Sequence, residues 1–188
     1  NVTATDVIIQ NNNVVPSEGA PAGGIFVDGT LILNSSQVLS NTAQFGGGIY
    51  NLGTLTIDQT IVQGNVDDDA YGGAGGILNN GGDVTVTRTA IISNTSGGVN
   101  SSGTTDLINT TISGNRSGNS GAGITAAGSA VTLNNVTVVR NEGVFTGGIL
   151  GDQQLTISNS LVAENLPINC GGPSTFVSGI HNLDAGTT

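Results

Sequence analysis

The sequence has no lysine, methionine or tryptophan, and only three arginines, one histidine and one cysteine. A nucleic-acid-binding protein needs a basic surface to displace counterions, so a chain with a net charge of −10 is not expected to bind nucleic acid. Anionic membranes are disfavoured for the same reason. No apolar run reaches the length of a transmembrane helix, so we expect no direct membrane insertion of this segment.

Aromatic residues make up only 3% of the chain, which constrains the core. A globular core of 188 residues normally uses large aromatic side chains, but here the apolar mass is isoleucine, valine and leucine. These residues alternate with asparagine, threonine, serine and 31 glycines, a pattern typical of short strands and tight turns. The composition therefore predicts a narrow core built from many similar layers.

An apolar residue followed three positions later by asparagine recurs along the whole chain. The apolar members, expected to point into the core, are Ile8, Val38, Val62, Ile91, Ile112, Val138 and Val162. The asparagines are Asn11, Asn41, Asn65, Asn94, Asn115, Asn141 and Asn165. Because asparagine tolerates left-handed backbone and its amide both donates and accepts, we expect these side chains to stack into a structural ladder along one corner.

Two more elements stand in constant order before each asparagine. The residues eight and ten positions before the asparagine are two apart, so they point to the same face of a strand. Those eight before are Leu33, Ile57, Val86, Leu107, Leu133 and Ile157, and those ten before are Leu31, Leu55, Val84, Thr105, Val131 and Leu155. All but Thr105 are apolar, so the layer that contains Thr105 is expected to be the weakest. A Gly-Gly-apolar element opens the repeats at 23–25, 47–49, 75–77, 97–99 and 147–149, with variants at 121–124 and 178–180.

The repeat predicts the fold class. Three short strands recur in fixed order, and the length variation falls mostly between the asparagine and the next glycine pair, which is typical of a coil with one insertion-tolerant corner. We predict an all-β, right-handed, single-stranded parallel β-helix of about seven coils with three short strands each. Residues 1–188 are expected to form one domain, with 165–188 as an irregular C-terminal turn or cap.

The Gly-Gly-apolar and apolar-x-x-Asn elements resemble the repeats of polymorphic outer-membrane proteins and of other bacterial secreted β-helix proteins. Residues 47–57 are similar to that set, and the resemblance covers about residues 1–165. It implies an extracellular or outer-cell-surface location. The tail from Cys170 is similar to the last turn of such domains, where a second cysteine often follows. The resemblance implies either a disulfide whose second cysteine lies outside this sequence or a small buried thiol.

Candidate chemistry is sparse. Polysaccharide lyases and hydrolases share the fold class, but Arg88, Arg116 and Arg140 fall at three different repeat positions, so they do not predict a catalytic column. The only acidic run is 67–69, where Asp67, Asp68 and Asp69 could supply hard oxygen ligands for calcium or form an exposed acidic loop. His181 has no partner at a zinc-ligand spacing. We expect no cofactor, with calcium as the alternative.

Three functions follow as hypotheses. The first is a non-catalytic extracellular or cell-surface scaffold, structural or adhesive, that binds itself end to end as a filament or binds a glycan or surface. The second is a carbohydrate-binding or polysaccharide-degrading protein. The third is an ice-binding protein, suggested by two outward columns: Ile32, Thr56, Thr85, Asp106, Thr132 and Thr156, then Ser36, Thr60, Thr89, Thr110 and Ser160.

Overall fold

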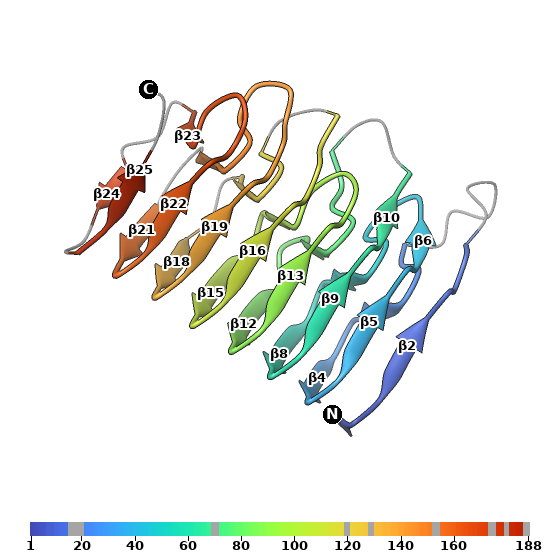
Figure 1. The fold of residues 1–188 in the computed structure, drawn as a ribbon. Helices are drawn as coiled ribbons and strands as arrows, with labels where there is room; N and C mark the ends of the chain where they lie inside the picture. The colour runs from blue at the N-terminus through green and yellow to red at the C-terminus, as the bar shows by residue number, and fades with distance from the viewer. Residues whose placement is uncertain are drawn as a thin grey trace.

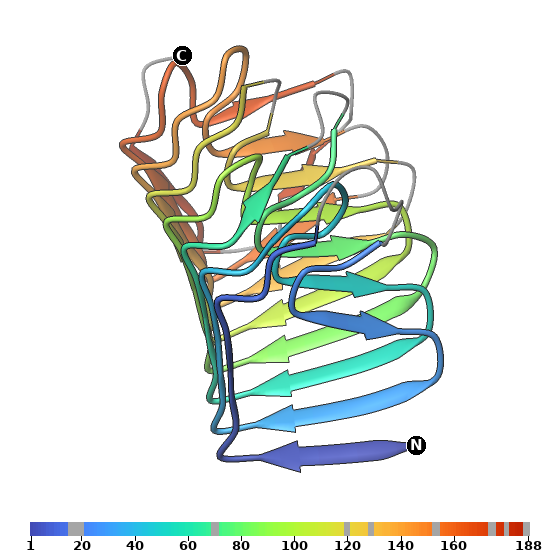
Figure 2. The same cartoon turned by 90° about the vertical axis from the view of Figure 1, so that its right-hand side faces the viewer.

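The computed structural model describes residues 1–14, 21–68, 72–118, 121–127, 130–151, 155–172, 176–178 and 181–185. Within these ranges the chain forms no helix and winds into a parallel β-helix with three long sheets (Figure 1). In Figure 2 the chain turns clockwise as it recedes from the N-terminal coil, so the coil is right-handed. The predicted fold class is therefore confirmed.

Each complete coil contributes one strand to each sheet. Sheet 1 contains the second strand of the repeat: β1 (Val2–Thr5), β4 (Thr30–Asn34), β8 (Thr54–Asp58), β12 (Asp83–Thr87), β15 (Thr104–Ile108), β18 (Val131–Asn134), β21 (Leu155–Ser158) and β24 (Phe176–Ser178). Sheet 2 contains the strand before the asparagine: β2 (Ile8–Gln10), β5 (Gln37–Leu39), β9 (Ile61–Gln63), β13 (Ala90–Ile92), β16 (Thr111–Ser113), β19 (Thr137–Val139), β22 (Leu161–Ala163) and β25 (Leu183–Ala185).

Sheet 3 contains the Gly-Gly-apolar element, and a short fourth pair follows two of the asparagines. The strands of sheet 3 are β3 (Ile25–Val27), β7 (Ile49–Asn51), β11 (Ile77–Asn79), β14 (Val99–Ser101), β17 (Ile124–Ala126), β20 (Ile149–Gly151) and β23 (Cys170–Gly171). The short pair is β6 (Thr42–Ala43) with β10 (Val66–Asp67). All pairings are parallel and in register, so equivalent residues of successive repeats lie side by side.

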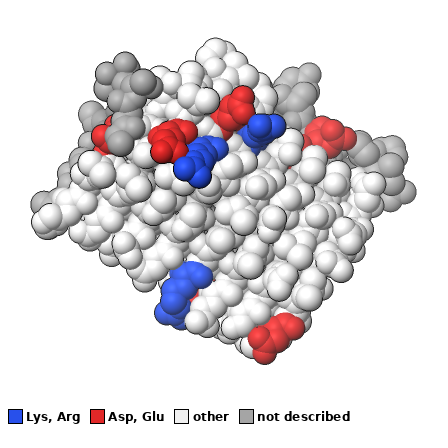
Figure 3. Space-filling model, in the orientation of Figure 1, with Lys and Arg blue, Asp and Glu red and all other residues white. Residues whose placement is uncertain are grey.

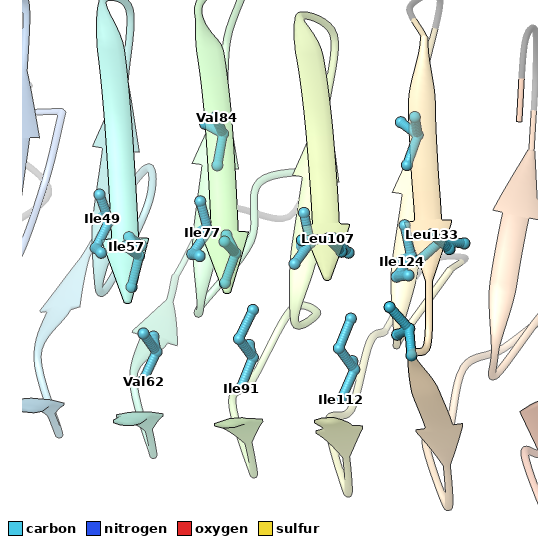
Figure 4. Packing of buried hydrophobic residues seen from close by; sticks show 14 of the residues in the cluster. Ile49, Ile57, Val62, Ile77, Val84, Ile91, Leu107, Ile112, Ile124 and Leu133 are labelled. Atoms are coloured by element: carbon cyan, nitrogen blue, oxygen red, sulfur yellow. The ribbon is translucent and has the colours of Figure 1, made fainter. Parts of the chain in front are cut away.

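The core is a stack of aliphatic side chains inside the three sheets (Figure 4). Val38, Val62, Ile91, Ile112 and Val138 are fully buried, and Val162 is nearly so, which confirms these predicted core positions. The two columns of sheet 1 are buried as expected. The layers remain thin because each is filled by only a few Ile, Leu or Val side chains.

The first repeat is shifted by one residue from the prediction. Ile9, not Ile8, aligns with Val38, and Ile8 points outward with 60% of its surface exposed. Asn12, not Asn11, donates to the side chain of Asn41. Both 8–9 and 11–13 are runs of one residue type, so residue identity alone did not fix the frame of this repeat. The hydrogen bonds to the next coil fix it instead.

The C-terminal part is more regular than expected. Strands β23, β24 and β25 extend all three sheets by another coil, although an irregular turn was predicted for 165–188. Ser178 pairs with Ile157 in sheet 1, so 178–180 is not a copy of the Gly-Gly-apolar element. Cys170 occupies that place, because it aligns with Ile149 in sheet 3.

Two corners of each coil are made by a single residue with positive φ. Between sheets 1 and 2 these are Asp6, Ser35, Gln59, Arg88, Asn109, Asn135, Asn159 and His181; after sheet 2 they are Asn11, Ser40, Gly64, Ser93, Gly114, Arg140 and Glu164. Left-handed backbone reverses the direction of the chain within one residue. At the third corner, between sheets 3 and 1, Gly53 lets the coils approach closely, because an added Cβ would lie 2.1 Å from the carbonyl oxygen of Gly29.

The buried column of sheet 2 can be tested with one charge. Val62 has no exposed surface and lies between Val38 and Ile91, so Val62→Asp would bury an unpaired carboxylate. We expect the free energy of unfolding to fall by about 3–5 kcal/mol, measured by urea denaturation. Gln63→Asp places the same charge on the exposed neighbour and should change it by less than about 0.5 kcal/mol. Equal stability of the two variants would contradict the inward assignment of Val62.

Candidate functional site

The asparagine ladder runs through the corner after sheet 2. After the first member, each side-chain Oδ1 accepts two hydrogen bonds from the ladder asparagine before it, one from its backbone N–H and one from its Nδ2. The donor lies in the preceding coil, except for Asn165, which lies four residues before its acceptor Asn169. From Asn12 to Asn169 these distances are all between 2.8 and 3.1 Å. The members are Asn12, Asn41, Asn65, Asn94, Asn115, Asn141, Asn165 and Asn169.

The bonds of each inner ladder asparagine account for its whole amide. In Asn94, for example, the second Nδ2 hydrogen is donated to the carbonyl oxygen of Val62, at 3.1 Å. Two donors and two acceptor sites are thereby used, and the side chain is 1% exposed. Nothing remains with which to bind a substrate. The ladder is therefore structural, as predicted, with Asn12 in place of Asn11.

A second ladder follows the corner between sheets 1 and 2, where outward side chains were expected. Ser36, Thr60, Thr89, Thr110 and Ser160 are at most 5% exposed, so this half of the predicted threonine array is wrong. Each hydroxyl donates to the carbonyl two residues earlier, as Thr60 does to Asp58 at 2.9 Å. The left-handed residue just before each hydroxyl turns it inward, which strict strand alternation does not anticipate.

The polar Thr105 layer is buried and hydrogen-bonded, and its expected weakness stays a prediction. The Thr105 hydroxyl lies 2.8 Å from that of Ser101, and both are within hydrogen-bonding distance of Nδ2 of Asn79. Asn79 also receives a bond from Asn51, so a short third ladder forms on the inner side of sheet 3. Oδ1 of Asn51 is the one buried side-chain polar atom without a partner among the described residues. Sequence alternation missed this network because its members come from four strands in two different sheets.

The three arginines form exposed ion pairs at separate places. Arg116 and Arg140 pair with Glu142 and Glu164 of the next coil, at 3.3 and 2.7 Å. Their side chains are more than 70% exposed, so each pair contributes at most about 1 kcal/mol.

Arg88 contacts Asp58 on the other rim of sheet 2. The hydroxyl of Thr87, which donates to Asp58, lowers the pKa of that carboxyl, and Arg88 acts in the same direction. The three arginines do not converge on one place, in line with their separate positions in the repeat.

The acidic run does not lie together on an exposed loop. Asp67 is 2% exposed, and its Oδ2 accepts the backbone N–H of Gly46 at 2.9 Å. Asp68 is exposed, and Asp69 lies outside the described residues. Among the described residues no group of three His, Cys, Asp or Glu side chains is arranged to hold a metal ion. Asp67 makes internal contacts, and its burial was not predictable because Gly46 is 21 residues away.

Cys170 is a free, half-buried thiol beside Ile149 in sheet 3. Burial raises the pKa of Cys170 to about 11, and the nearby carboxylate of Asp184 acts in the same direction. The thiol is therefore protonated at neutral pH and acts as a small apolar side chain against the core. Within this chain Cys170 is a buried thiol, and the disulfide to a cysteine outside this sequence stays a prediction.

The outer face of sheet 2 is flat and uncharged. Its outward side chains are a mixture of aliphatic and neutral polar residues: Ile8, Gln10, Gln37, Leu39, Ile61, Gln63, Ala90, Ile92, Thr111, Ser113, Thr137, Val139, Leu161, Ala163 and Leu183. Figure 3 shows the charges at the two rims of this face and none across it. With a net charge of −10, such a face is a distinct feature of the surface. This face was not predicted from the sequence, although the repeat spacing already places these outward residues in columns.

The outer face of sheet 1 carries the rest of the predicted threonine array. Thr56, Thr85, Thr132 and Thr156 lie in one column, interrupted by Ile32 and Asp106. This single column replaces the double array on which the ice-binding hypothesis was based.

Two further findings bear on function. No helix of the described residues is long and apolar enough to cross a membrane. Comparison with protein-family models, curated proteins and solved structures finds no match.

The ladder predicts a steep position dependence for asparagine. Asn94→Ala removes the acceptor of two hydrogen bonds from Asn65 and the donor of the bonds to the Val62 carbonyl and to Oδ1 of Asn115. All of these groups lie in a buried corner. We expect a loss of about 3–5 kcal/mol in the free energy of unfolding, measured by urea denaturation. Asn12→Ala, in the exposed first rung, should cost less than about 1 kcal/mol. Similar losses in the two variants would contradict a ladder that stabilises the interior.

The burial of Cys170 predicts slow thiol exchange. Because its folded pKa is about 11, the thiolate fraction at pH 8 is far below that of an unfolded thiol, whereas each thiolate is a stronger nucleophile. We expect reaction with Ellman's reagent to be about 20-fold slower in native protein than in urea. The raised pKa stabilises the fold below about pH 8.5, and this contribution is lost as pH rises through 11. Equal rates would refute the buried, protonated thiol.

Proposed function

We propose that the protein is a non-catalytic extracellular scaffold of a bacterial cell surface, which acts by structure and adhesion. The uncharged outer face of sheet 2 carries this proposal. Its strands, stacked in register from β2 to β25, present neutral side chains between two charged rims. A large neutral face on an otherwise acidic rod is suited to contact with a second copy or with a neutral extracellular surface.

The internal construction supports the same function. A scaffold must keep a face in fixed geometry, and here the coils are joined by three parallel sheets and by two side-chain ladders. Because each coil contacts mainly its neighbours, the rod is a series of similar units whose stability adds along the axis. The ion pairs at the rims are exposed and separate, and we assign them to the solvated surface.

The test compares charge on two faces of the same coils. Ile61→Lys with Thr111→Lys charges sheet 2, and Thr54→Lys with Thr104→Lys charges sheet 1 at exposed positions of the same coils. We expect the parent protein to self-associate in sedimentation velocity and negative-stain electron microscopy, the sheet 2 variant to stay dispersed because like charges repel, and the sheet 1 variant to associate normally.

Other outcomes are equally informative. Filaments that persist in both variants would move the contact to the coil ends and keep the scaffold function. Dispersed rods together with cleavage of polygalacturonate would replace it by the polysaccharide-degrading alternative. Dispersed rods with thermal hysteresis would favour the ice-binding alternative, through the threonine column of sheet 1.

A further inference from the structure

We propose that a hollow over sheet 3 binds a neutral sugar residue of a glycan chain. The hollow has a volume of about 380 Å³, within the usual range of small-molecule sites. Its apolar lining includes Phe45, Tyr50 and Leu78, and its polar lining includes Asn80, Asn100 and Ser102. The proposal deepens the scaffold function by naming a ligand, and it rests on that function only for the expectation that glycans are present.

Three of the protein's six aromatic residues lie together at this place. Phe26 and Tyr50 stand side by side on the outer face of sheet 3, with ring centroids 5.8 Å apart, and Phe45 joins Tyr50 in the hollow. Phe26 is 47% exposed. In a chain with 3% aromatic residues, exposed rings in one cluster indicate a contact surface rather than a core. A pyranose ring offers a matching apolar face of C–H groups.

The polar side chains are arranged in advance. Nδ2 of Asn80 donates to the Tyr50 hydroxyl at 2.6 Å, and the Ser102 hydroxyl donates to Oδ1 of Asn80 at 3.3 Å. The Tyr50 hydroxyl hydrogen and Oδ1 of Asn100 have no partner among the described residues, so one donor and one acceptor face the ligand. Paired donors and acceptors beside an aromatic platform suit the hydroxyl groups of a sugar.

The wall of the hollow is held by the buried carboxylate of Asp67. This group accepts the N–H of Gly46, next to Phe45, and packs against Gly73, where an added Cβ would lie 1.7 Å from Oδ2. Gly46 and Gly73 belong to loops of successive coils. A charge-assisted bond to a backbone N–H in a dry site is strong, so Asp67 keeps both loops in place. Asp67 is thus a positioning residue for the hollow.

Charge selects the class of sugar. None of the described lining residues is an aspartate, glutamate, histidine, lysine or arginine, and the protein as a whole carries a charge of −10. A polyuronate would meet repulsion without a cation to offset it. A neutral glycan, of glucose, xylose, mannose or N-acetylglucosamine units, meets none.

The experiment titrates native protein by calorimetry with cellohexaose, xylohexaose, mannohexaose and chitohexaose, with polygalacturonate as the charged comparison. We expect one neutral oligosaccharide to bind with a Kd of about 1 mM or tighter. Tyr50→Ala and Asn80→Ala should weaken it at least about tenfold, and Tyr50→Phe by less, since the ring platform remains. Leu150→Ala, in the same outward column but outside the hollow, should bind normally.

Each remaining result would overturn the proposal. These are no binding of any neutral oligosaccharide, binding of polygalacturonate alone, or binding that Tyr50→Ala and Asn80→Ala leave unchanged while the variants remain folded by circular dichroism. A loss in Leu150→Ala equal to that in Asn80→Ala would place the contact on the whole face instead. None of these results alters the self-association measurement, so the scaffold function and the sugar site fail independently.

Discussion

The amide ladder after sheet 2 is the interaction on which the rest of the structure depends. A buried asparagine is costly unless both its donors and its acceptor are satisfied, and here the ladder asparagines of the two adjacent coils and one backbone carbonyl satisfy them. A strand that slipped by one residue would break two such bonds and expose its aliphatic column. The ladder therefore sets the register of all three sheets, and Ile, Leu and Val then fill layers of fixed spacing.

The same constraint explains where the chain is free to vary. Residues between the end of sheet 1 and the ladder keep a constant count, because two left-handed residues and a buried hydroxyl or asparagine must recur there. After the ladder asparagine no recurring contact fixes the number of residues, and the segments before the next glycine pair differ in length. Two of these segments, near Phe45 and Gly72, border the hollow over sheet 3. Surface features that differ from coil to coil therefore arise in the segments whose length and sequence the repeat does not fix.

The sequence predicts the periodic parts of this structure and misses those that depend on partners far along the chain. The buried columns at Val62 and Leu107 follow from spacing, because parallel coils place equal offsets side by side. The predicted register of the first repeat was wrong by one residue, because its runs of isoleucine and asparagine fit the repeat in two ways. Thr60 was predicted to point outward but is buried, because the left-handed residue before it reverses the alternation of inward and outward side chains. The burial of Asp67 was not predicted, because its hydrogen-bond partner Gly46 lies in the preceding coil and spacing along the chain does not identify such a partner.

An uncharged sheet face such as that of sheet 2 is less open to strand-to-strand aggregation in a stacked coil than at the edge of an open sheet. Aggregation of sheets proceeds mainly through unpaired backbone at edge strands. In a stacked coil, every inner strand is paired on both sides, so its outer face offers side chains alone. Contacts through that face then depend on side-chain fit and neighbouring charge, which the rims at Arg140 and Asp58 supply. Under the proposed scaffold function, a neutral face of this kind would select its partners through the charged residues at its borders.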